Sequence, residues 1–254
     1  MHEITLVELD QPEQAVVEPI GDGDVAAAVD EIRRAEQSTL LDRTWLATYL
    51  LPRLGLNDEF RHEFPDALQP FCGHGVRSWQ FPCQFAGYLV HLADKNITSY
   101  LEIGVRHAGT FIITCEYLDR FTHLEKMVAV DPFQSRNLAT YQELQPRASH
   151  IAAYSTSFAG RQAIGSRMWD HVLIDGDHTA SACMFDFLLV KDRARRAAFH
   201  DIVSHTNPGV VQTWDAIRHV TPTRRIFEQT QQYAEIFAKG QQQTLMGLGV
   251  VELV

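Results

Sequence analysis

The 254-residue sequence is poor in cysteine, in basic residues and in long apolar runs, and each shortage narrows the class of protein. Its four cysteines form no Cys-x-x-Cys motif and are typical of reduced packing thiols in a cytoplasmic protein. A net charge of −10 argues against a nucleic-acid groove or an anionic membrane surface as partner. No run is long enough to span a membrane, and the N-terminus lacks a signal-peptide pattern.

The length fits one large domain, or one domain with an appendage. Residues 1–97 show helical patterns at 25–34, 44–51 and 82–94, with a loop rich in proline and glycine before the last of them. Asp24 is expected to cap the first helix. We predict that this region is a mainly helical cap or a homo-oligomerisation arm.

From residue 98 to the C-terminus the pattern alternates between strand and helix, which predicts a parallel α/β sheet. The expected strands lie at 99–103, 126–130, 149–153, 170–174 and 195–199, with a final pair at 225–228 and 244–251. The expected helices lie at 109–121, 157–165, 179–191 and 209–219.

Polar clusters follow two of these strands directly. Asp175 and His178 follow the strand that ends at Ile174, and His200 and Asp201 follow the next strand. Ligands bind at the carboxyl ends of strands in open α/β sheets, and these two ends should lie side by side. Carboxylates and imidazoles that converge there indicate a divalent cation with a base beside it.

The first two strands carry the signs of a ribose-bearing cofactor. The first runs into Glu102 and a glycine-containing turn, from Gly104 to Gly109 and Thr110, where the backbone can approach a ligand. The second ends at Asp131, whose carboxylate can accept hydrogen bonds from ribose hydroxyls.

The dinucleotide fingerprint Gly-x-Gly-x-x-Gly is absent, because Arg106 stands where its second glycine belongs. Glu102 would repel a pyrophosphate at this turn, but it suits a cationic ligand such as S-adenosylmethionine. An NAD-dependent oxidoreductase is the alternative enzyme, against which the missing fingerprint counts.

Several segments together resemble a class I S-adenosylmethionine-dependent methyltransferase, and more narrowly the metal-dependent group of macrolide-sugar O-methyltransferases and cephalosporin-hydroxylase-like proteins. The likeness extends over residues 77–254. It is carried by Trp79-Gln80-Phe81-Pro82, Tyr100-Leu101-Glu102-Ile103-Gly104, Val130-Asp131, Ile174-Asp175-Gly176-Asp177-His178, Phe199-His200-Asp201 and Gly209-Val210-Val211-Gln212-Thr213-Trp214. Ala108 departs from the commoner glycine pair of this group, and its methyl group restricts the turn.

The resemblance implies a Rossmann-like sheet of seven strands, the last of them antiparallel, in an S-adenosylmethionine-binding domain at 98–254. It implies that Tyr154 and Ser155 contact the adenine ring. It also implies a magnesium ion, with manganese as the substitute, held by Asp175 and by the pair His200 and Asp201.

In that group the pair is acidic, so His200 is either a ligand or a neighbour of one. His178 matches the position of the catalytic base, and its ordinary pKa near neutrality suits that role. The sequence therefore predicts a metal-dependent O-methyltransferase of a hydroxylated small molecule, such as a natural-product sugar, with a non-catalytic cofactor-binding assembly protein as a further alternative.

Overall fold

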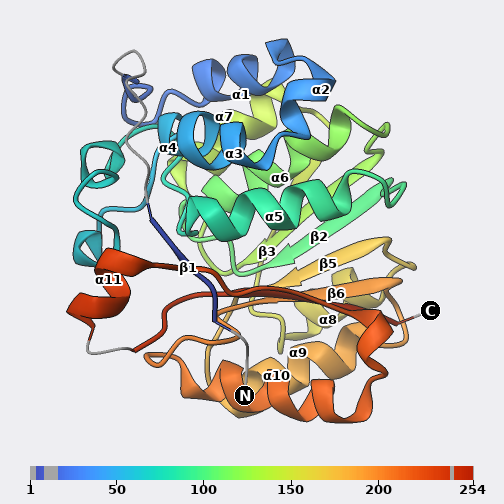
Figure 1. Ribbon diagram of the computed structural model, residues 1–254. Helices are drawn as coiled ribbons and strands as arrows, with labels where there is room; N and C mark the ends of the chain where they lie inside the picture. Colours follow the sequence, from blue (N-terminus) through green and yellow to red (C-terminus); the bar gives the residue numbers. More distant parts are fainter. Residues whose placement is uncertain (1–3, 9–16, 241–242, 254) are drawn as a thin grey trace.

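The computed structural model describes residues 4–8, 17–240 and 243–253. It contains a seven-stranded sheet in the order β4-β3-β2-β5-β6-β9-β7 (Figure 1). The strands are β2 (Ser99–Ile103), β3 (Lys126–Asp131), β4 (Ala148–Ala152), β5 (His171–Ile174), β6 (Arg196–His200), β7 (Ile226–Gln229) and β9 (Leu248–Glu252). Only β9 runs antiparallel to its neighbours, β6 and β7. This is the Rossmann-like methyltransferase sheet that the sequence predicts.

Helices cover both faces of the sheet (Figure 1). One face carries α1 (Val25–Arg34), α5 (Pro82–Leu92), α6 (Gly109–Asp119) and α7 (Arg136–Leu144), and the other carries α8 (Phe158–Gly165), α9 (Ala180–Val190) and α10 (Pro208–Val220). Alternate residues of β2 face opposite cores, since Tyr100 packs with the first set and Leu101 with the second. Both faces are buried, as expected of a parallel sheet.

The N-terminal helices share the core of the sheet. They are α1, α2 (Gln37–Leu40), α3 (Arg43–Trp45), a π turn (Leu46–Leu50), α4 (Leu51–Arg53) and α5. Asp24 accepts a hydrogen bond from the backbone of Ala27 and so caps α1, as predicted. A short strand β1 (Leu6–Val7) pairs with β8 (Gln232–Tyr233) beside α11 (Ala234–Lys239). Whether this region also joins copies of the chain stays a prediction.

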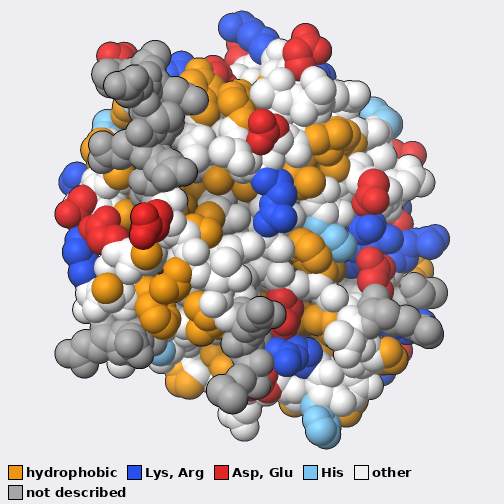
Figure 2. Space-filling view, in the orientation of Figure 1, with side chains coloured by type: hydrophobic (Ala, Val, Ile, Leu, Met, Phe, Trp, Pro, Cys, Tyr) orange, Lys and Arg blue, Asp and Glu red, His pale blue; other side chains and the backbone are white. Residues whose placement is uncertain are grey.

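The last strand is shorter than predicted. The pattern favours a strand over 244–251, but β9 begins at Leu248. Met246 and Gly247 both have positive φ angles, of 56° and 103°, so the backbone turns before the strand starts. On the face seen in Figure 2, acidic and basic side chains are interspersed with apolar ones. Among the described helices, none is long and apolar enough to cross a membrane.

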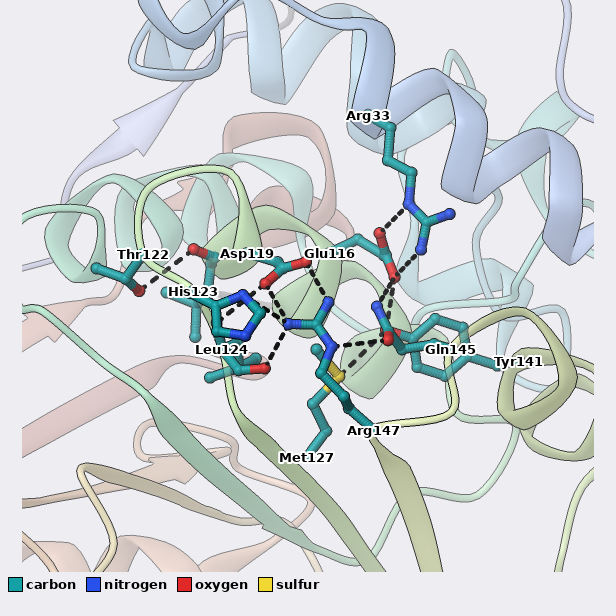
Figure 3. A network of polar contacts seen from close by, with 11 residues as sticks. Arg33, Glu116, Asp119, Thr122, His123, Leu124, Met127, Tyr141, Gln145 and Arg147 are labelled. Carbon is teal, nitrogen blue, oxygen red and sulfur yellow. Dashed lines mark hydrogen bonds and ion pairs between the residues drawn. The ribbon is translucent and has the colours of Figure 1, made fainter.

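Arg33 ties α1 to the sheet domain (Figure 3). Its guanidinium group donates to both oxygens of Glu116 on α6, at 2.7 and 3.0 Å, and Tyr141 of α7 donates to the same carboxylate at 2.8 Å. Glu116 is only 1% exposed, so its charge depends on these donors.

Arg33→Met is expected to lower the free energy of unfolding by about 1–3 kcal/mol, because it leaves a buried carboxylate without its cation. Arg34→Met is the matched control: Arg34 pairs with Asp30 at the surface, and its loss is expected to cost below about 0.5 kcal/mol. Urea denaturation of both variants measures the difference, and equal losses would contradict the anchoring role of Arg33.

His171 makes stability fall in mild acid. It is fully buried in β5, its Nε2 lies 2.6 Å from the Tyr88 hydroxyl, and burial lowers its pKa from 6.5 to about 3. Between these values the unfolded chain binds a proton that the folded chain does not, so the free energy of unfolding decreases as pH falls. The decrease from this group is about 2 kcal/mol between pH 7 and pH 5. His171→Gln should show a correspondingly shallower pH dependence in denaturant titrations, and an unchanged slope would assign the acid sensitivity to other groups.

Candidate functional site

The carboxyl ends of β2, β3, β5 and β6 open into a cavity of about 1130 Å³. Every site residue that the sequence predicts lines it. These are Glu102, Gly104, Gly109, Thr110, Asp131, Tyr154, Ser155, Asp175, His178, His200 and Asp201. One edge of the sheet therefore collects all of them.

Asp131 organises the turn after β2. Its Oδ2 accepts hydrogen bonds from the backbone of Val105 at 2.9 Å and of Arg106 at 3.1 Å, and its Oδ1 accepts one from Phe133. Ala108, the residue that departs from the commoner glycine, adopts a left-handed conformation with φ of 67°. The added methyl group thus does not prevent the turn from forming, but it places strain there.

Glu102 presents a buried acid to the cavity. Its side chain is 1% exposed, and burial raises its pKa well above the usual range. The Tyr100 hydroxyl donates a hydrogen bond to it at 2.5 Å, which lowers the pKa but does not offset the effect of burial. Among the described residues, no cationic side chain pairs with it. A buried acid without a cation is suited to a ligand that brings its own positive charge.

Gly109 acts through packing. A Cβ at this position would lie 2.5 Å from the backbone nitrogen of Ser78, so the glycine lets α6 approach the N-terminal segment. Thr110 is nearly buried beside it, whereas Tyr154 is 63% exposed at the rim of the cavity.

Asp175, His200 and Asp201 form a compact set of donors, with ligand atoms within 4.8 Å of one another. The Nδ1 of His200 lies 3.2 Å from Asp175 Oδ1 and 3.7 Å from Asp201 Oδ2, while Asn207 donates to that Asp201 oxygen at 2.6 Å. Among the described residues, the buried Nε2 of His200 has no hydrogen-bond partner, while its Nδ1 faces the two carboxylates. Two carboxylates and an imidazole this close together fit a place where a cation binds.

His178 lies against the same carboxylates. Its Nε2 is 3.3 Å from Asp175 Oδ1, and its Nδ1 is 3.6 Å from Asp201 Oδ2. Burial opposes both shifts, but the two histidines lower the pKa of Asp175 to about 2 and the carboxylates raise that of His178 to about 9. A divalent cation bound to the carboxylates would offset their negative charge and so lower the pKa of His178 toward neutral pH.

Asp177 stays outside this set. It is exposed, and its Oδ1 accepts a hydrogen bond from the backbone of Thr179, which is itself the cap of α9. Trp214 is fully buried, in agreement with a core role, and His205 lies outside the cavity lining.

The N-terminal segment supplies cavity residues that the sequence did not single out as site residues: Glu59, Phe60, Glu63, Arg77 and Trp79. Glu59 pairs with Arg106 and with His107 of the turn after β2. Only Trp79 carried a signal, as part of the resembling segment before α5.

Residues 101–202 match the family model described as a methyltransferase domain. No curated protein matches the chain. The solved structures similar to it include the O-methyltransferase from Bacillus cereus in complex with S-adenosylhomocysteine, with 13% identity, TM-score 0.47 and coverage of 90% of this chain and 96% of the other. Another is the O-methyltransferase TomG from Streptomyces achromogenes in complex with S-adenosylmethionine, involved in tomaymycin synthesis, with 10% identity, TM-score 0.48 and coverage of 70% and 82%.

Likeness at this level does not transfer the substrates of those proteins. Residues 101–202 are thus similar to a methyltransferase domain, and the strand order of the sheet is that of the Rossmann-like methyltransferase fold.

Proposed function

We propose that the protein transfers a methyl group from S-adenosylmethionine to a hydroxyl of a small molecule with the help of a divalent metal ion. The observation that supports this most is the convergence of Asp175, His200 and Asp201 with His178, in the cavity that also holds Glu102 and Asp131. A methyltransferase without metal chemistry has no need of such a donor set.

The cofactor residues follow from the charges and hydrogen-bonding groups at β2 and β3. Glu102 accepts from the amino group of the methionine part, and Asp131 accepts from the ribose hydroxyls. The turn from Gly104 brings backbone close to the ligand, and Tyr154 and Ser155 border the adenine.

The metal residues are Asp175, Asp201 and His200. A divalent cation held by them would lower the pKa of a bound hydroxyl. Magnesium prefers the two carboxylates, whereas the imidazole of His200 favours manganese or another transition metal. His178 takes the hydroxyl proton, and the cavity residues hold the acceptor oxygen in line with the methyl group.

The resemblance to macrolide-sugar O-methyltransferases favours a natural-product sugar as acceptor. In this proposal the N-terminal segment supplies the acceptor side of the cavity, and it would thus act as a cap.

The proposal is tested first by cofactor binding. Asp131→Ala is expected to weaken S-adenosylhomocysteine binding by about 2–3 kcal/mol, since it removes two charge-assisted hydrogen bonds and releases the turn after β2. Isothermal calorimetry measures the change, and Asp177→Ala, an exposed acid at the same rim, is the control. Unchanged affinity in Asp131→Ala would defeat the cofactor assignment.

The metal is tested separately. Methyl transfer to a panel of hydroxylated metabolites, followed by product mass spectrometry, should stop with a chelator and return with magnesium or manganese. Full transfer by metal-free protein would exclude the proposed chemistry.

A further inference from the structure

One wall of the cavity is built from two stacked aromatic rings and a carboxylate. The rings of Phe60 and Trp79 lie 5.2 Å apart at an interplanar angle of 19°. The Nε1 of Trp79 donates a hydrogen bond to Glu63 Oε2 at 3.3 Å. We call Phe60, Trp79 and Glu63 the acceptor wall. All three lie outside residues 101–202, and none has a role in the binding of cofactor or metal described above.

The acceptor wall spans the region between the cofactor turn and the metal residues. At one end, the guanidinium group of Arg106 lies 5.0 Å from the centre of the Trp79 ring. At the other end, Glu63 lines the same cavity as Asp201 and His200. A molecule whose hydroxyl reaches the metal residues can therefore lie against this wall.

The wall offers negative charge through Glu63. Among the described residues, no cationic side chain pairs with this carboxylate, which accepts a hydrogen bond from the Trp79 indole. The two arginines on this side are already held by acids: Arg77 by Asp22 and Asp58, and Arg106 by Glu59.

Arg136, the third arginine of the lining, is at the start of α7. That helix follows β3, on the other side of β2 from the metal residues of β5 and β6. A phosphate or carboxylate on the acceptor would thus meet the carboxylate of Glu63 and arginines that acids already hold, whereas a cation would meet that carboxylate and the exposed ring of Phe60.

We propose that the acceptor is a hydroxylated amine, such as an amino sugar or an amino alcohol, and that its ammonium group binds to Glu63 beside the open face of Phe60. This inference rests on the proposed function, because it uses the same cavity and the same metal site. It adds the chemical class of the substrate and the residue that selects it. Phe60, 43% exposed, supplies the open aromatic face.

The experiment measures ligand binding to the protein loaded with S-adenosylhomocysteine and magnesium. It uses two sets of ligands, each with an amine, an amide and an acid on a similar scaffold. The first set is glucosamine, N-acetylglucosamine and glucuronate. The second set is tyramine, N-acetyltyramine and 4-hydroxyphenylacetate. Ligand-observed NMR titration gives each dissociation constant. In at least one set, the amine is expected to bind at least about tenfold more tightly than the amide, which is the gain expected from one charge-assisted contact. The acid is expected to bind most weakly.

Glu63→Gln should remove the advantage of the amine and leave the amide unchanged, and Phe60→Ala should reduce the advantage in part. Asp66→Asn is the control: this exposed acid follows shortly in the chain, pairs with Lys239 and lies outside the cavity lining, so the advantage should remain.

Three results overturn the inference: amide or acid binding as tightly as the amine in both sets, an amine advantage that survives Glu63→Gln, or no amine binding at all. Calorimetry with S-adenosylhomocysteine and with manganese separates this failure from that of the proposed function. Normal cofactor and metal binding without amine preference defeats only the substrate class, whereas loss of cofactor or metal binding in the unaltered protein defeats the function itself.

Discussion

His178→Ala is expected to lower the turnover of methyl transfer by about 10²–10⁴-fold while S-adenosylhomocysteine binds almost as before. His178 stands three residues after Asp175, so the first residues beyond β5 bring its ring back beside the metal residues. Its nitrogens face both Asp175 and Asp201, but neither contacts Glu102 or Asp131. The effect should therefore fall on the proton transfer and leave the cofactor in place.

A residual rate that rises with pH is expected of the variant, because the metal still ionises part of the acceptor hydroxyl. His205→Ala is the matched control, since His205 donates to the Thr244 carbonyl outside the cavity lining. Turnover is measured at several pH values on an acceptor found by product mass spectrometry. If His178→Ala has the same turnover as the unaltered protein at neutral pH, the proton is taken up by His200 or by bulk water instead.

Gly104→Ala is expected to lower the free energy of unfolding by about 2–5 kcal/mol and to abolish cofactor binding. A Cβ there would lie 2.1 Å from the carbonyl oxygen of Asp175 and 2.6 Å from the Cα of Gly176. These are backbone atoms and cannot rotate away. The φ angle of 82° adds about 1–2 kcal/mol of steric cost for a residue with a side chain, and the overpacking adds about 1–3 kcal/mol.

Because the clash displaces Asp175, Gly104→Ala should also lose metal binding, although Gly104 contacts no metal. Gly165→Ala is the control: nothing lies within 4 Å of its added Cβ, and it ends α8, where alanine favours the helix by about 0.5–1 kcal/mol. Urea denaturation and calorimetry with manganese measure both effects. Unaltered stability in Gly104→Ala would show that the turns after β2 and β5 are free to separate.

The sheet and its polar edge were accessible from sequence because both arise from local patterns. Apolar runs predict β2, β3, β5 and β6, and the chain direction of parallel strands then places Asp175 beside His200. The helix α7 was not predicted, because it buries little more than Leu138 and Tyr141 and its apolar stripe is short. Ser135, which caps it, was its only distinct local signal.

The acceptor wall could not be predicted in the same way. Phe60 and Glu63 belong to an irregular segment, and their place is fixed by contacts with residues distant in the chain, such as the pairing of Glu59 with Arg106. Periodicity carries no information about such contacts. The left-handed conformation of Ala108 is similar, because a non-glycine residue gives no local signal for it.

The cavity is lined partly by the N-terminal segment and partly by the edge of the sheet, and this affects how the protein can evolve. The turn Arg61–Glu63 buries none of its residues, whereas Phe64 directly after it is fully buried. Substitutions in the turn can thus change the acceptor while the sheet, the cofactor residues and the metal residues stay as they are. Related enzymes should accordingly diverge fastest at positions 60–63, and exchange of this short stretch should be a route to new acceptors.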